Sequence, residues 1–79
     1  MSTSNNGVQQ MASGSYLHTE GSATTTWNVA HNLNVQYCAV EVFDSTDKQV
    51  IPDTITFTDS NNLVITFSTA TAGKARVVG

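Results

Sequence analysis

Clusters of turn-forming residues divide the chain from Tyr16 onward, roughly every 10–15 residues. The stretches between these clusters are short and alternate apolar with polar side chains, which is the pattern of half-buried strands. None of them keeps the period of an amphipathic helix. The spacing therefore predicts an all-β fold, a small antiparallel sandwich or barrel-like meander of about five or six short strands.

The turns and the alternation together place the extended segments. These segments are residues 16–20, 24–31, 37–43, 49–51, 54–58, 63–68 and 74–78. Asn32 and Asn34 fall in a predicted turn, since asparagine tolerates positive φ. Pro52 cannot donate a ladder hydrogen bond, so it marks an edge, a bulge or a break. Residues 59–62 are expected to form the turn of a hairpin between the two strands that flank them.

Residues 1–15 differ from the rest of the chain, because they are small, polar and nearly uncharged. Apart from Met1, Val8 and Met11 are their only sizeable apolar side chains, so the segment has no core of its own and is predicted to be an N-terminal arm. Residues 16–79 are long enough for a single β domain. We expect a neighbouring subunit to order the arm, which makes Val8 and Met11 candidate interface residues.

The charge of the chain limits its partners. Six Asp and Glu residues stand against three Lys and Arg, and only 11% of the residues are charged. Phosphate binding needs clustered basic side chains, so nucleic acid is not expected as a partner. No apolar run reaches the ~18 residues of a membrane span and no signal peptide is evident, so no membrane is expected either. The single cysteine, Cys38, cannot close an intrachain disulfide, which is compatible with synthesis in a reducing cytoplasm.

No catalytic, metal-binding or cofactor-binding motif is visible in the sequence. His18 and His31 lack further ligands at an organised spacing, so His31 is interpreted as a strand-ending residue that bonds to a backbone carbonyl. Asp44, Asp47 and Asp59 fall in turns, where aspartate is favoured for bonding the local backbone, and no EF-hand loop is present. No serine lies in a Gly-x-Ser-x-Gly context. We therefore expect neither an enzyme nor a cofactor.

Trp27, Tyr16 and Tyr37 allow two interpretations. Exposed aromatic rings could stack on a sugar, which would make Trp27 and Tyr16 ligand-binding residues. The chain has only one Trp, two Tyr and three Phe, however, and a domain this small needs most of them for its core. The interpretation of Trp27 as the anchor of the core is therefore favoured.

Residues 37–43 are apolar on both faces, apart from one glutamate. Alternation divides their apolar side chains into two sets: Cys38, Val40 and Val42 on one face, and Tyr37, Ala39 and Phe43 on the other. One thin sheet buries only one such face, so we expect the second set to pack against a symmetry mate or a scaffold. The alternative is a sandwich that buries both faces by itself.

Residues 25–79 carry an ordered series of short motifs. The series comprises an aromatic strand at Trp27, His-Asn-Leu at 31–33, Phe-Asp-Ser at 43–45, Ile-Pro-Asp at 51–53, a Thr-rich strand at 54–58, Asp-x-Asn at 59–61, Ile-Thr-Phe at 65–67 and Gly-x-Ala-x-Val-Val-Gly at 73–79. In order and spacing it resembles a small β module of tailed-phage virion proteins, which include tail-fibre and appendage ends and capsid decoration or cement proteins. The resemblance implies a building or attachment element that is often trimeric, and it brings no catalytic residues.

The resemblance also suggests where such a protein acts. In fibres the module usually ends a long chain, whereas here it starts almost directly from Met1. We therefore expect a virion protein synthesised in the host cytoplasm, namely a trimeric capsid decoration or cement protein that binds the major capsid protein and stabilises the head. The alternative is a tail-fibre or appendage tip that binds a glycan or protein of the host surface.

Overall fold

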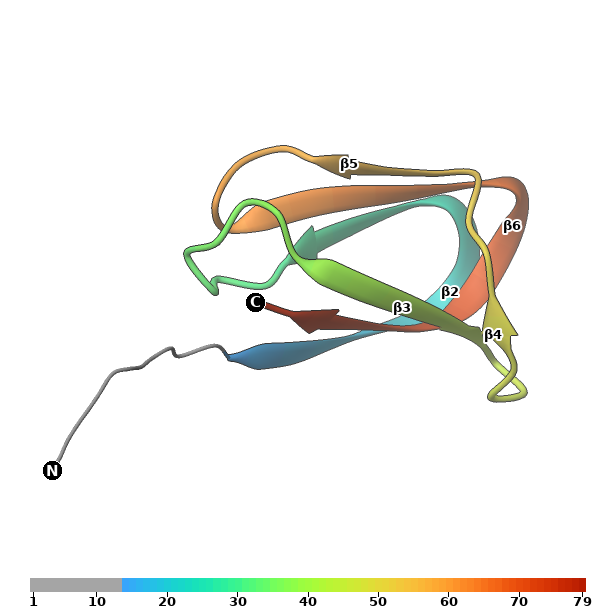
Figure 1. The fold of residues 1–79 in the computed structure, drawn as a ribbon. Coiled ribbons are helices and arrows are strands. Elements are labelled where there is room, and N and C mark those ends of the chain that lie inside the picture. Colours follow the sequence, from blue (N-terminus) through green and yellow to red (C-terminus); the bar gives the residue numbers. More distant parts are fainter. Residues whose placement is uncertain (1–13) are drawn as a thin grey trace, which may run out of the picture.

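The computed structural model describes residues 14–79 (Figure 1). These residues form five antiparallel strands of one sheet and no helix, which confirms the predicted all-β class. The strands are β2 (Ser15–Ala30), β3 (Ala39–Asp44), β4 (Gln49–Val50), β5 (Thr54–Phe57) and β6 (Asn62–Val78). Between Gly14 and Gly79, no helix is long and apolar enough to cross a membrane. Val8 and Met11, with almost all of the predicted arm, lie outside the described residues.

β2 and β6 are long strands that bend together. They pair antiparallel along nearly their whole lengths. The register shifts twice between Glu20 and Thr26, and Figure 1 shows both strands turning back on themselves. The prediction of separate short strands at 16–20 and 24–31, and at 63–68 and 74–78, is therefore wrong, because each pair is one continuous strand with a bend. Irregular pairing of this kind lets a strand change direction without losing its partner, and the small residues at both places leave room for it.

The bend folds the single sheet into two layers. The β3 layer contains the first half of β2, the second half of β6, β3 and β4 (residues 15–20, 73–78, 39–44 and 49–50). The β5 layer contains the second half of β2, the first half of β6, and β5 (residues 24–30, 62–66 and 54–57). The strand order β2-β6-β3-β4, with β5 also paired to β6, is not the sequential order of a meander and fits the sandwich-like alternative.

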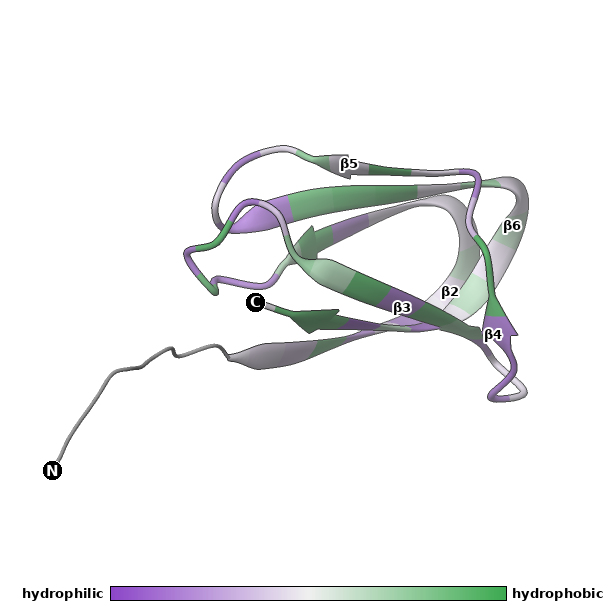
Figure 2. Cartoon of the chain, in the orientation of Figure 1, coloured by the Kyte–Doolittle hydropathy of each residue, from purple (hydrophilic) through white to green (hydrophobic). Residues whose placement is uncertain are grey.

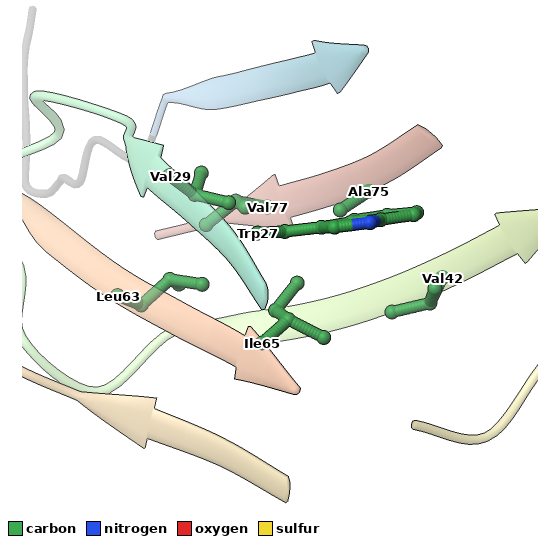
Figure 3. Packing of buried hydrophobic residues seen from close by; sticks show 7 residues of the cluster. All are labelled: Trp27, Val29, Val42, Leu63, Ile65, Ala75 and Val77. Carbon is green, nitrogen blue, oxygen red and sulfur yellow. The ribbon is translucent and has the colours of Figure 1, made fainter. Parts of the chain in front are cut away.

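Side chains from both layers meet in one small core (Figure 3). It consists of seven buried apolar residues, namely Trp27, Val29, Val42, Leu63, Ile65, Ala75 and Val77. Trp27 is the largest of them and has no exposed surface. Its ring packs against Phe67, with the ring centroids 4.7 Å apart. The structure thus places Trp27 at the centre of the core, in agreement with the favoured interpretation.

β3 has the predicted two-faced alternation but is shorter than predicted. Val42 is buried and Val40 packs against the core, whereas Ala39 and Phe43 point to the outer face of the β3 layer. Figure 2 shows a polar band interrupting the apolar colour of this strand. Tyr37 lies in a bend before the strand begins, so the alternation does not extend to it.

Local turn chemistry follows the predictions. Asn32 and Asn34 have positive φ values of 56° and 58°. β5 and β6 form the predicted hairpin, and at its turn the Asp59 carboxylate accepts a hydrogen bond of 2.8 Å from the backbone N–H of Asn61. Pro52 lies in the connection between β4 and β5, where it marks a break rather than a strand edge or a bulge.

Candidate functional site

Five large apolar side chains of the described residues are exposed instead of being packed in the core. They are Tyr16, Leu17, Val35, Tyr37 and Ile51. Ile51 is 96% exposed, Tyr37 75% and Leu17 55%. They lie on the first half of β2, on the loop before β3, and on the connection between β4 and β5. Because the core holds only seven residues, these five are a large share of the apolar side chains and are the candidates for contact surfaces.

β2 lies at the edge of both layers. Within residues 14–79 its only partner is β6, so the other side of this 16-residue strand carries backbone N–H and C=O groups that face no described strand. Because β2 bends, one half of this edge belongs to the β3 layer and the other half to the β5 layer (Figure 1). Strand edges of this kind are sites where further strands add.

The inward face of the first half of β2 is polar beyond Tyr16. His18 and Glu20 stand opposite core-facing residues of β6, and His18 Nε2 lies 2.8 Å from Glu20 Oε1. The His18 ring also lies beside Trp27, with the ring centroids 5.9 Å apart. The His18–Glu20 pair covers the side of the core next to Trp27. Leu17, which precedes His18 in the strand, points to the opposite, outer face.

The residues predicted to form one interface do not share a continuous face. Ala39 and Phe43 lie on the outer face of the β3 layer, where Ala39 is exposed and Phe43 is half-buried. Tyr37 lies beside the β5 layer instead, with its ring centroid 6.0 Å from that of Phe57. The chain changes direction between Asn34 and Tyr37, and this change removes Tyr37 from the outward row of β3.

His31 is buried in the loop of residues 31–38 and bonds to its backbone. Its Nδ1 accepts a hydrogen bond of 3.1 Å from the backbone N–H of Leu33, whereas a carbonyl partner was predicted. Its Nε2 lies 4.0 Å from Cys38 Sγ, which donates to the carbonyl of Val35 at 3.0 Å. Burial raises the pKa of the Cys38 thiol, so the sulfur is not an activated nucleophile. Both side chains hold the loop in place.

A cleft of about 290 Å³ lies between the β3–β4 end of one layer and the bend of β6. Its lining includes Asp44, Asp53 and Phe67. The Asp44 carboxylate is engaged in its own turn, where hydrogen bonds from the Thr46 hydroxyl and from the backbone N–H groups of Lys48 and Thr46 lower its pKa. In the part of the chain that the structure describes, no three His, Cys, Asp or Glu side chains gather as metal ligands do.

Only one of the aromatic side chains considered for ligand stacking has a largely free ring. Trp27 is fully buried, so stacking on it would require the core to open. Tyr16 is only partly exposed on the edge strand. Tyr37 is the most exposed aromatic residue described and is the better candidate for contact with a ligand.

Comparisons with known proteins provide no relative from which a site could be transferred. No protein-family model, no curated protein and no solved structure matches the chain. The candidate surfaces are therefore defined by the geometry alone: the edge of β2 that faces no described strand, and the exposed apolar side chains.

Proposed function

We propose that this chain is a structural protein of a phage virion, which associates with itself and adds contact area to a larger assembly. One observation carries the proposal. The described residues bury seven apolar side chains in the core and leave five large ones exposed. A domain with so small a core commonly gains stability from association, because covering apolar surface contributes about 25 cal/mol per Å².

Within a virion, we propose capsid decoration as the role. The protein would contact the major capsid protein and copies of itself, and the resemblance described above favours a trimer. Such a protein strengthens the head by adding interface area between neighbouring subunits, without a chemical step. Leu17, Tyr37 and Ile51 are the exposed side chains that support contacts of this kind.

The experiment compares phage particles that contain the protein with particles that lack it. Particles without the protein should release their DNA at a lower temperature, and adding the purified protein back should restore the tolerance. A Leu17→Lys, Tyr37→Ser, Ile51→Lys triple variant should restore less. Equal heat tolerance of the two kinds of particle would rule out the decoration role.

A binding module at a tail-fibre or appendage tip is the second candidate. The exposure of Tyr37 is the observation that favours it, because an exposed aromatic ring can stack on a sugar. Binding of the purified protein to host cells or to a glycan array would support this role, and Tyr37→Ser should abolish the binding. Tyr16→Ser is the matched control, and Trp27 fluorescence reports whether each variant is folded.

A further inference from the structure

We infer that this chain pairs with a second copy of itself along β2, so that both layers of the sandwich continue into the neighbour across one two-fold axis. The inference rests on the proposed self-association and names the surface that produces it. That surface is the double edge, which is the side of the two halves of β2 (residues 15–20 and 24–30) that pairs with no strand among residues 14–79.

The double edge has backbone groups available in both layers. In the described residues each half of β2 pairs with β6 on one side only. Backbone N–H and C=O groups on the other side of an edge strand readily pair with an added strand. A partner that covers the whole of β2 must therefore supply two strand segments, one for each layer.

The geometry of the double edge favours a second copy over an extended peptide. Its two halves belong to one bent strand, so they run in opposite directions and are separated by the distance between the layers, which is roughly 10 Å in packed sheets. A single extended peptide can pair with only one half. A second copy presents the same two segments at the same separation, and a two-fold axis normal to the layers sets each half antiparallel to its own counterpart.

The side chains of β2 are compatible with such pairing. The strand carries one carboxylate, Glu20, and that group is held by His18 at 2.8 Å on the inward face. Like charges directly opposite each other oppose strand pairing. Pairing of β2 with β2 brings no row of like charges together across the axis. The outward side chains include the exposed Leu17 and Thr26, which are apolar or β-branched and suit a paired strand.

Two-fold pairing sets the number of copies. β2 can meet β2 in this way only in pairs, so the inference predicts a dimer, or a trimer of dimers in a larger assembly, in place of a plain trimer. The mass of the full-length protein in solution, measured by light scattering over a range of concentrations, should correspond to an even number of copies.

Two variants test the surface itself. Leu17→Lys and Thr26→Lys each place a charge on the outward side of one half of β2, and each should weaken association about tenfold or more. Thr56→Lys is the matched control, because Thr56 is exposed and lies on β5, away from β2. It should leave the association constant unchanged. Circular dichroism and Trp27 fluorescence verify that each variant is folded.

The possible outcomes separate this inference from the proposed function. A plain trimer, or an association that Thr56→Lys weakens as much as Leu17→Lys, would overturn pairing along β2 and leave the structural role intact. A monomer at every concentration, with no gain in particle stability, would overturn both. An even-numbered oligomer that only the two β2 variants dissociate supports the inference.

Discussion

The indole N–H of Trp27 donates a hydrogen bond of 2.9 Å to the backbone carbonyl of Thr71. Trp27 lies on the second half of β2, and Thr71 lies where β6 bends from one layer into the other. The bond therefore connects the largest side chain of the core to the bend at which the sheet passes from one layer to the other. It also provides a partner for an indole N–H that burial would otherwise leave unsatisfied.

Trp27→Phe should lower the free energy of unfolding by about 1–3 kcal/mol, because it removes this donor and leaves a small cavity. Urea unfolding followed by far-UV circular dichroism measures the change. Tyr37→Phe is the control, since Tyr37 is 75% exposed, and it should stay within about 0.5 kcal/mol of the wild type. Equal stability of Trp27→Phe and the wild type would show that the bond to Thr71 does not hold the bend.

Gly73→Ala should be strongly destabilising. Gly73 lies where β6 passes β3, its φ is 157°, and a Cβ atom there would overlap the carbonyl oxygen of Phe43. The substitution must push β3 away from β6, and we expect a loss of about 3 kcal/mol or more. Gly21→Ala makes the same chemical change at a position where the added Cβ atom would have no atom within 4 Å beyond its chain neighbours. The melting temperature of this variant should therefore differ little from that of the wild type. Similar melting temperatures for the two variants would contradict this account.

The features predicted correctly from the sequence are those that local chemistry determines. Asn32 and Asn34 take positive φ because their side chains tolerate it, and Asp59 holds its turn through a backbone N–H two residues away. The order of the strands was not predictable in this way. β6 pairs with β2 and β3, which are far from it in the chain, and no local pattern specifies such pairing.

The candidate surfaces were only partly predictable for the same reason. Alternation shows that Tyr16 and Leu17 point to opposite faces, but it does not show that β2 lies at an edge. The exposure of Ile51 depends on the connection between β4 and β5, which crosses from one layer to the other. Alternation alone includes Tyr37 in a strand of residues 37–43, because the bend that precedes β3 has no distinctive sequence.

Acid should destabilise the protein through Asp44 and Asp59. Hydrogen bonds from the Thr46 side chain and from backbone N–H groups lower the pKa of Asp44, and those from the Asn61 backbone and the Asn62 side chain lower that of Asp59. A pKa lower in the folded state means that the folded state favours the ionised form. The resulting stability is fully present above the ordinary aspartate pKa of about 4 and is lost as the pH falls through the lower folded values.

Asp44→Asn should therefore flatten the decline of stability below about pH 4 and lower the stability at neutral pH. Melting temperatures measured between neutral and acidic pH give the profile. Asp47→Asn serves as the control, because Asp47 has a positive φ of 66° that asparagine also tolerates. An Asp44→Asn profile parallel to that of the wild type would mean that these turn hydrogen bonds do not couple folding to pH.

His31→Phe should open the loop of residues 31–38. Phenylalanine fills a similar volume but cannot accept the hydrogen bond from the Leu33 N–H, and an unsatisfied buried donor costs about 1–3 kcal/mol. Because Cys38 lies 4.0 Å from the ring, its half-buried thiol should then react faster with a disulfide reagent. Labelling at several low urea concentrations identifies the cause, since local opening depends little on urea and global unfolding depends on it steeply. A rate that is faster and independent of urea supports His31 as the residue that fixes the loop, whereas an unchanged rate would assign this role to the other contacts of the loop.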